Sequence, residues 1–154
     1  MLRKLQIPDV GPRSFFEDTS RTHDFSMCAG EFMEVYSDQS GNWDSIVTCF
    51  FIDTAPNVIE YVETFYRLLK PGGVWINLGP LLYHWQNGGG ETDERYQRSV
   101  ELSYQEVRHV IESYGFQFLK EESKKCLYTG NKLSMMHTVF NCVFFSVQKP
   151  REGK

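Results

Sequence analysis

The sequence predicts an α/β fold with a covered, mostly parallel sheet, and three neighbouring stretches carry this prediction. An unbroken apolar run from Ile46 to Ile52 indicates a buried strand. Apolar residues then recur at helical spacing from Val58 to Leu69, which predicts a helix. Lys70–Gly73 (KPGG) ends this helix because proline cannot continue it, and Val74–Leu78 indicates a second buried strand. A strand, a helix and a strand in this order form a β-α-β unit with parallel strands.

The chain before this unit carries weaker signals. Residues 1–24 are rich in turn-forming residues and lack helix or strand periodicity, so we interpret them as an irregular lead-in. Phe25–Ala29 alternates weakly between apolar and polar residues, which predicts a short strand. Gly30 and Glu31 follow it, and the pattern alone favours a solvated loop carboxylate for Glu31.

A loop, a helix and two strands follow the central unit. Gln86–Arg98 is polar and contains three consecutive glycines, so we expect a surface loop there. Ser103 and Glu106 have the spacing of a capping box, which predicts the start of a helix. Phe116–Glu121 and Asn141–Lys149 predict strands, whereas most of the segment between them fits no single pattern.

The composition is that of one folded domain, which we place at residues 25–150, followed by a charged tail at residues 151–154. Of the 154 residues, 41% are hydrophobic and 15% are aromatic, which is enough to bury a core. The net charge is −4 and no basic stripe is present, so we expect no nucleic-acid partner. No apolar run approaches the roughly 20 residues of a membrane span, so we expect no membrane partner either.

The four cysteines argue against a metal site. They lie far apart in the sequence and include no Cys-x-x-Cys pair, unlike the ligands of structural zinc or the framework of a secreted disulfide-rich domain. We therefore expect no bound metal and reduced thiols. Reduced thiols are typical of the cytoplasm and the nucleus, and we expect the chain in the cytoplasm and also in the nucleus.

Candidate ligand residues occupy the carboxyl ends of the two parallel strands, where ligands of such sheets bind. Asp53 follows the first strand, and Tyr83 and His84 follow the second. Asp53 has two interpretations, because a carboxylate there can hold the N–H of a substrate ring or cap the next helix. His84 is either a ligand residue or a half-buried side chain with satisfied partners, and Tyr83 is either a pocket residue or rim packing.

A nucleotide-binding sheet of this type also needs a first strand that leads into a glycine-rich turn. Nothing before Phe25 supplies it. The consecutive glycines Gly88–Gly90 follow the second strand and lack the lysine and hydroxyl of a phosphate loop. The chain is therefore either a small sheet of its own kind or the second half of a larger α/β domain.

Several motifs resemble those of one enzyme family. They are FFIDTAPNVIEY, LLKPGG, INLGPLLYHW, SMCAGEF, ELSYQEV and LSMM. Together they resemble the carnosine N-methyltransferase family, whose members are class I S-adenosylmethionine-dependent enzymes. The resemblance runs from about Ile7 to Pro150, and Asn77–His84 is its most specific part. It implies the C-terminal half of a Rossmann-like class I methyltransferase sheet, mixed and mostly parallel, with an antiparallel last strand.

The resemblance also implies a binding site for S-adenosyl-L-methionine. In the family, the residues matching Glu31 and Phe32 border the adenine side of the cofactor. Those matching Cys49 and Phe50 lie along its pocket. These four residues are therefore the expected cofactor-binding residues.

The same resemblance implies a site for a small-molecule or dipeptide substrate. The residues matching Asp53 and His84 face an imidazole-bearing substrate, so we expect both to be catalytic and to bind substrate. Tyr83 joins them as an expected substrate-binding residue because it also follows the carboxyl end of the second strand. The family carries tyrosines near the substrate after its LSMM motif, and Thr138 and Phe140 occupy the places expected for them.

The implied activity is N-methylation of the imidazole of carnosine or a related histidine-containing peptide. The alternative is a catalytically silent interaction or regulatory fragment of a methyltransferase. The glycine-rich motif of the family and its first two strands have no match in this sequence. We therefore expect the edge of Ile46–Ile52 to be exposed, the chain to self-associate through it, and activity to require further sequence upstream.

Overall fold

The computed structural model describes residues 26–85, 94–128, 130–131 and 133–151. The chain divides into two compact units, Met1–Glu31 and Phe32–Lys154. In the first unit the described residues, 26–31, form neither helix nor strand. The strand predicted at Phe25–Ala29 is therefore wrong over residues 26–29, and Phe25 lies outside the described residues. A weak alternation is a poor predictor here, because a strand of this length is stable only beside another strand.

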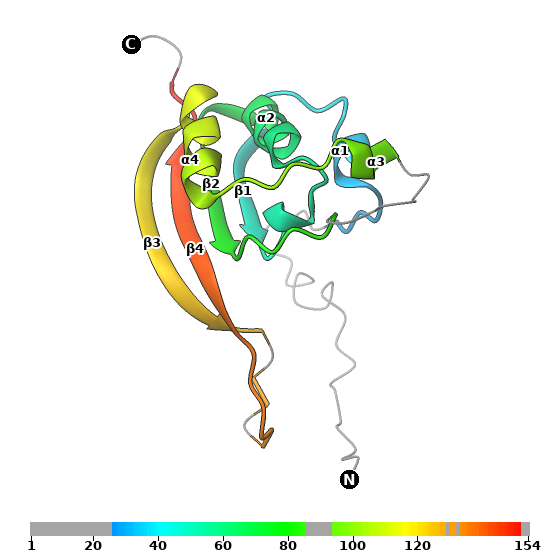
Figure 1. Cartoon of the computed structure of the whole chain (residues 1–154). Helices are drawn as coiled ribbons and strands as arrows, with labels where there is room; N and C mark the ends of the chain where they lie inside the picture. The colour runs from blue at the N-terminus through cyan, green and yellow to red at the C-terminus, as the bar shows by residue number, and fades with distance from the viewer. Residues whose placement is uncertain (1–25, 86–93, 129, 132, 152–154) are drawn as a thin grey trace, which may run out of the picture. The chain divides into compact units, whose positions relative to one another are not determined.

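The second unit is built on a four-stranded sheet with the order β1-β2-β4-β3 (Figure 1). Its strands are β1 (Trp43–Cys49), β2 (Leu69–Gly79), β3 (Gln117–Leu127) and β4 (Val139–Gln148). β1 and β2 are parallel, whereas β4 is antiparallel to both β2 and β3. β1, β2 and β3 therefore run in one direction and β4 in the other. This confirms the mixed, mostly parallel sheet with an antiparallel last strand.

Two helices, α2 (Val58–Leu68) and α4 (Tyr104–Ser113), lie on one face of the sheet (Figure 1). The side chain of Asn57 caps α2 by accepting a hydrogen bond from the backbone N–H of Ile59 at 3.0 Å. Ser103 and Glu106 cap α4 through the predicted capping box, in which both reciprocal hydrogen bonds are present. Both predicted helices are thus confirmed.

Three shorter helical segments complete the described part of the second unit. They are α1 (Phe32–Val35), the 3-10 helix η2 (Ile52–Thr54) and α3 (Glu94–Gln97). α3 forms where a surface loop was predicted for Gln86–Arg98, and residues 86–93 of that prediction lie outside the described residues. No helix in the described ranges is long and apolar enough to cross a membrane.

The strand boundaries differ from the predicted ones because strand pairing overrides local signals. β2 begins at Leu69, so the predicted turn Lys70–Gly73 lies inside it as an irregularity in its pairing with β1. Gly72 has a φ of +82°, which favours glycine, and its N–H donates to the carbonyl of Lys149 at 2.9 Å. The ambiguous segment Lys124–Phe140 contributes the ends of β3 and β4, which pair with each other.

The core lies between the sheet and the two long helices, with Trp75 at its centre. The Trp75 ring is fully buried and lies 4.6 Å from the ring of Phe65 and 4.9 Å from that of Phe145. Its Nε1–H donates to Thr48 Oγ1 at 2.9 Å, and the Thr48 hydroxyl donates to Asn77 Oδ1 at 2.8 Å. These satisfied polar groups fix β1 against β2 inside an otherwise apolar core.

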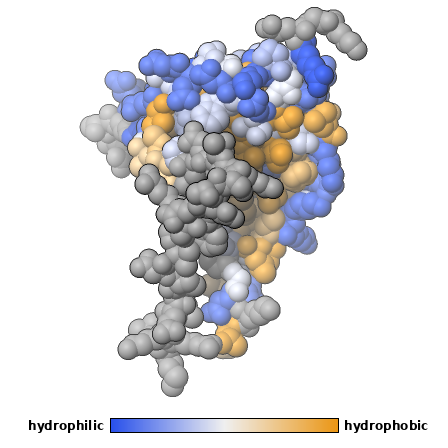
Figure 2. Space-filling view, turned by 180° about the vertical axis from the view of Figure 1, so that it is seen from behind, coloured by the Kyte–Doolittle hydropathy of each residue, from blue (hydrophilic) through white to orange (hydrophobic). Residues whose placement is uncertain are grey.

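The opposite face of the sheet carries side chains that remain partly exposed. Val47, Ile76 and Ser146 occupy one row across β1, β2 and β4 on this face, and Val47 is 70% exposed. No helix of the described residues covers this row. Seen from behind, this side presents hydrophobic next to hydrophilic surface (Figure 2).

Candidate active site

The candidate site begins where β1 ends. Phe50 follows the last residue of β1 and has a φ of 49°, a left-handed conformation that costs a non-glycine residue about 1–3 kcal/mol. Its N–H still donates to the carbonyl of Leu78 at 2.8 Å. A Cβ atom at Gly79 would lie 3.1 Å from the N and Cα atoms of Phe50, so this close approach favours glycine. The chain therefore turns sharply here and presents η2 beyond the sheet.

η2 places Asp53 in a buried position, with 2% of the residue exposed. The backbone N–H of Leu82 donates to Asp53 Oδ2 at 3.0 Å. This is the one hydrogen bond to the carboxylate found among the described residues, so Oδ1 is available for a ligand. The helix-cap interpretation of Asp53 is wrong, because Asn57 caps α2.

The segment after β2 is fastened to η2 by two further hydrogen bonds. His84 Nδ1 lies 3.0 Å from the backbone carbonyl of Asp53, and because a carbonyl only accepts, Nδ1 carries the proton. The Nε1–H of Trp85 donates to the carbonyl of Thr54 at 2.8 Å. In neutral His84 the second ring nitrogen is then an acceptor. Asp53 and His84 thus lie close together, as expected for residues that follow the carboxyl ends of neighbouring parallel strands.

A cavity of about 330 Å³ opens beside these two residues. It is lined by Phe50, Asp53, Thr54, Pro80, Leu82, His84, Tyr128 and Phe140. The rings of Phe50, Tyr128 and Phe140 contact one another at centroid distances of 5.5–5.7 Å. We call this space the acidic cavity, since it combines a carboxylate and an imidazole with three aromatic rings. A flat ring that carries an N–H group matches that lining.

A second cavity, of about 470 Å³, lies along β1. Its lining is mostly apolar and consists of Phe32, Tyr36, Trp43, Ser45, Ile46, Val47, Thr48, Cys49, Phe51, Phe65 and Leu68. Two of the expected cofactor residues, Phe32 and Cys49, are among them. The third, Phe50, is adjacent to Cys49 and lines the acidic cavity instead. The aromatic and apolar lining fits a flat, weakly polar group such as adenine.

The other predicted site residues lie elsewhere. Glu31 is the last residue of the first unit. The Tyr83 hydroxyl donates to the carbonyl of Leu102 at 2.7 Å, and burial raises the pKa of Tyr83 despite this hydrogen bond. Thr138 is exposed and is absent from the lining of either cavity. Tyr83 therefore holds the backbone around the site, and its predicted contact with substrate stays a prediction, as does that of Thr138.

Tyr128 is a cavity residue that sequence reasoning missed. It follows β3 directly, in a stretch without clear periodicity, and it meets Phe50 and Phe140 only because β3 and β4 pair as a hairpin. The signal in the sequence that could have found Tyr128 was an aromatic residue beyond the end of a predicted strand, where ligands bind. Among the described residues, no group of three or more His, Cys, Asp or Glu side chains is arranged to hold a metal ion.

The first comparison concerns the fold. The structure is similar to that of a SAM-dependent methyltransferase of Methanosarcina mazei, with a TM-score of 0.51 and 12% identity over 74% of this chain and 62% of that one. At this level of identity the similarity concerns the fold alone. The four-stranded sheet with α2 and α4 is thus part of a SAM-dependent methyltransferase fold.

Sequence comparison then identifies the family. The family model for carnosine N-methyltransferase matches residues 1–151. The chain is 49% identical to the carnosine N-methyltransferase of Rattus norvegicus over 97% of its own length and 42% identical to that of Dictyostelium discoideum over 95%. It belongs to the carnosine N-methyltransferase family. It spans 35% of the rat protein and 29% of the Dictyostelium protein, about a third of the length of these relatives.

Proposed function

We propose that this chain forms the substrate side of a methyltransferase that uses S-adenosyl-L-methionine to methylate an imidazole nitrogen of carnosine or a related histidine-containing dipeptide. The observation that carries the proposal is the Asp53 carboxylate. It is buried, one of its oxygens is held by the N–H of Leu82, and it borders a cavity lined by three aromatic rings. Membership of the carnosine N-methyltransferase family supports the same substrate.

Asp53 would orient the imidazole for attack. Methyl transfer to nitrogen requires a free lone pair aligned with the methyl group, and an imidazole has only one such nitrogen when neutral. Oδ1 of Asp53 can accept a hydrogen bond from the ring N–H, which directs the opposite nitrogen away from the carboxylate. As the nitrogen bonds to the methyl group, the ring becomes positively charged, and the nearby carboxylate stabilises that charge. The ring N–H keeps its proton during the transfer, and the cationic product loses that proton after release.

His84 and the aromatic residues would hold the substrate in place. The hydrogen bond from His84 Nδ1 to the Asp53 carbonyl fixes the imidazole of His84 at the cavity wall. Its second nitrogen can then accept a hydrogen bond from the amide or amino group of a dipeptide. Phe140 and Tyr128 provide ring faces against which an imidazole, and especially its cationic product, can pack.

The methyl donor would lie along β1, next to the acidic cavity. Phe32 and Cys49 line the larger cavity there, and their apolar surface suits the adenine and the sulfur-bearing chain of S-adenosyl-L-methionine. When bound, the donor supplies an electrophilic methyl group. Phe50 lines the acidic cavity while its sequence neighbours Cys49 and Phe51 line the larger one, so its unusual backbone conformation would set the boundary between donor and acceptor.

Titration calorimetry with carnosine tests the proposal. We expect carnosine to bind the folded chain, and homocarnosine, which keeps the imidazole, to bind similarly. A dipeptide that carries phenylalanine in place of histidine lacks the ring N–H and should bind more weakly by about tenfold or more, since a hydrogen bond to a charged group contributes about 1.5–3 kcal/mol. S-adenosylhomocysteine, titrated separately, reports on the donor side.

The rival function is a catalytically silent interaction fragment of a methyltransferase. It predicts no binding heat with carnosine or S-adenosylhomocysteine from a chain whose circular dichroism and cooperative thermal unfolding show that it is folded. Equal affinity for the imidazole and phenyl dipeptides would also contradict the substrate proposal, since nonspecific apolar packing would explain it.

A further inference from the structure

The segment that follows β2 is held in place by side-chain hydrogen bonds. Residues 80–85 form neither helix nor strand. Among the described residues, every hydrogen bond of this segment involves a side chain, and three of these bonds end on η2. The N–H of Leu82 bonds to the Asp53 carboxylate, and the side chains of His84 and Trp85 bond to the carbonyls of Asp53 and Thr54. The placement of the carboxylate therefore depends on a small number of contacts.

Trp85 supports the end of η2. The backbone hydrogen bonds of this short helix use the carbonyls of Phe51 and Ile52 as acceptors. The Thr54 carbonyl comes later in the chain and needs a partner from outside the helix. Its partner is the Nε1–H of Trp85, at 2.8 Å. The indole thus satisfies a backbone group of η2 that η2 itself leaves unpaired.

Two residues of α3 fix the indole ring of Trp85. Arg95 Cζ lies 4.7 Å from the ring centroid, which is a cation–π distance. The Tyr96 ring packs against the indole edge-to-face, with the two centroids 4.9 Å apart. A ring that is packed on by another element has little freedom to turn its N–H away from the acceptor. α3 therefore keeps the Trp85 N–H directed at the Thr54 carbonyl.

We propose that Trp85 is a positioning residue of the acidic cavity, through which α3 holds η2 and the Asp53 carboxylate in place. Trp85 is absent from the lining of the cavity, whereas Thr54 and Asp53 are part of it. Trp85 therefore acts through η2 and not by touching a ligand. The consequence for imidazole binding rests on the proposed function, but the placement of Asp53 is a property of the chain that can be measured without any ligand.

Amide hydrogen exchange, followed by NMR without ligand, tests the placement. Trp85→Phe keeps an aromatic ring but removes the N–H. The Leu82 N–H, which donates to Asp53, should then exchange about 2–10-fold faster, the range for the loss of one neutral hydrogen bond. Trp43→Phe is the matched control, because it removes an indole N–H that donates to Gln39 Oε1 at 2.9 Å, and it should leave the Leu82 exchange unchanged.

A second variant tests the part played by α3. Tyr96→Ala removes a ring that packs on Trp85 but leaves the hydrogen bond to η2 possible. The Leu82 exchange should become faster in this variant too, by less than in Trp85→Phe. An unchanged rate in a folded Tyr96→Ala variant would exclude α3 from the proposal.

A double-mutant cycle of carnosine binding, measured by calorimetry, tests the coupling of Trp85 to Asp53. Trp85→Phe should weaken carnosine binding by about 2–10-fold. It should not weaken binding of the dipeptide that carries phenylalanine, because that ligand has no ring N–H for Asp53 to hold. In the Asp53→Asn background, Trp85→Phe should have no further effect, since it acts through the carboxylate.

The outcomes separate this inference from the proposed function. Unchanged Leu82 exchange in a folded Trp85→Phe variant would overturn the positioning role, whatever the chain binds. Additive effects of Trp85→Phe and Asp53→Asn on carnosine affinity would also overturn it, because they would show that Trp85 does not act through Asp53. A wild-type chain that binds no carnosine would contradict the proposed function instead, and the Leu82 exchange would still decide the role of Trp85.

Discussion

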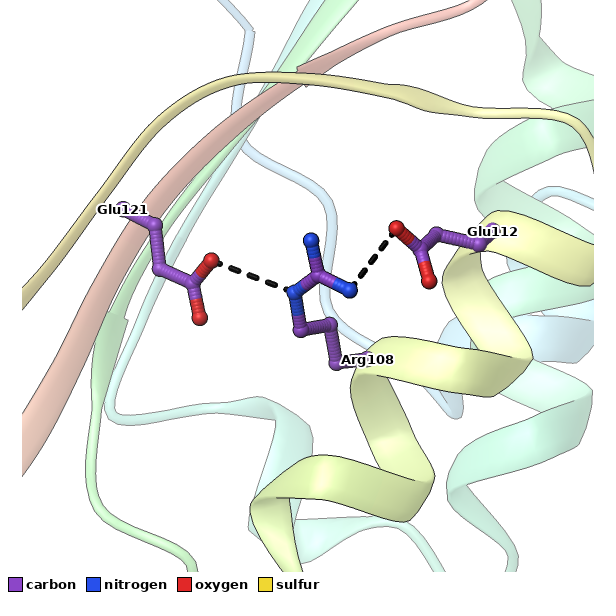
Figure 3. Close-up of polar contacts among 3 residues, drawn as sticks. All are labelled: Arg108, Glu112 and Glu121. Atoms are coloured by element: carbon purple, nitrogen blue, oxygen red, sulfur yellow. Dashed lines mark hydrogen bonds and ion pairs between the residues drawn. The ribbon is translucent and has the colours of Figure 1, made fainter.

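The two edge strands of the sheet, β1 and β3, differ in what they present to the surroundings. β3 carries Lys120, Glu122 and Lys124 along one face, and Glu122 is paired with both lysines. On its other face, Glu121 is paired with Arg108 of α4 at 3.2 Å, and Arg108 also pairs with Glu112 (Figure 3). β1 presents exposed apolar surface centred on Val47 instead, with a cavity beside it.

β3 is therefore an edge strand whose charged side chains face solvent, whereas β1 is an edge strand with an exposed apolar side chain. Charged side chains on β3 disfavour pairing with another strand, because an added strand would have to desolvate them. β1 has no comparable protection, and its carboxyl end leads directly to Phe50 and Asp53. The larger cavity lies along β1, and the acidic cavity lies at the carboxyl end of β1, where Tyr128 from beyond β3 also lines it. We therefore expect ligand binding to concentrate at β1 and its carboxyl end, whereas β3 contributes the ion pairs with α4 and leads to Tyr128 in the acidic cavity.

The largest expected effect comes from weakening the core beneath each edge. Phe65→Ala removes a fully buried ring that contacts Trp75 and lines the cavity next to β1, so it should lower the free energy of unfolding by about 3–5 kcal/mol. Phe118→Ala, beneath β3, removes a half-buried ring that also contacts Arg108, and it should cost about half as much. Urea unfolding measures both. Equal losses of unfolding free energy would show that the core beneath β1 and the core beneath β3 contribute equally to stability.

A smaller effect is expected from the cap of α4, the helix that carries Arg108 to β3. Ser103→Ala removes one side of the capping box and should lower the free energy of unfolding by about 1 kcal/mol. Ser113→Ala, at the other end of the same helix, is the control, because its hydroxyl donates to the local carbonyl of Val110 and the loss of this bond should cost less. Comparable losses from the two variants would mean that the capping box stabilises the helix no more than a local side-chain hydrogen bond does.

The smallest effect concerns the charges of β3 in acid. Hydrogen bonds from Lys120 and Lys124 lower the pKa of Glu122 from its ordinary value of 4.5 to about 2. A carboxylate with a lowered pKa in the folded state stabilises that state above its ordinary pKa, and the contribution is lost as the pH falls toward 2. Because the group is exposed, the effect on the thermal midpoint should be slight. Glu122→Gln should flatten the decline between pH 4.5 and pH 2, and an unchanged decline would contradict this account.

Periodicity and turn residues were sufficient to predict most of this fold. The helices near Val58–Leu69 and after Ser103, and the strand at Val74–Leu78, follow from local patterns that the tertiary structure keeps. The predicted end of the first strand at Ile52 was three residues too late. An apolar run does not reveal that Phe50 adopts a positive φ against the backbone of Gly79, because that constraint comes from the neighbouring strand.

The candidate site was predictable only where it depends on strand ends. Asp53 and His84 meet because the carboxyl ends of parallel strands lie together, which is a property of topology. Tyr83 occupies the same rim in sequence but bonds to Leu102, and no local pattern distinguishes these two outcomes. Tyr128 enters the acidic cavity through the β3–β4 hairpin, whose length was not evident from the sequence.

The central claim is that the acidic cavity at the end of β1 binds the imidazole through Asp53. The most direct test compares the carnosine affinity of Asp53→Asn and Asp44→Asn by calorimetry, because both variants exchange one carboxylate for an amide of the same shape. Asp53→Asn should weaken binding by about 10–100-fold, the range for a lost hydrogen bond to a charged group. Asp44→Asn, which alters only an exposed pair with Lys70, should leave the affinity unchanged. Equal affinities for wild type and a folded Asp53→Asn variant would contradict the account.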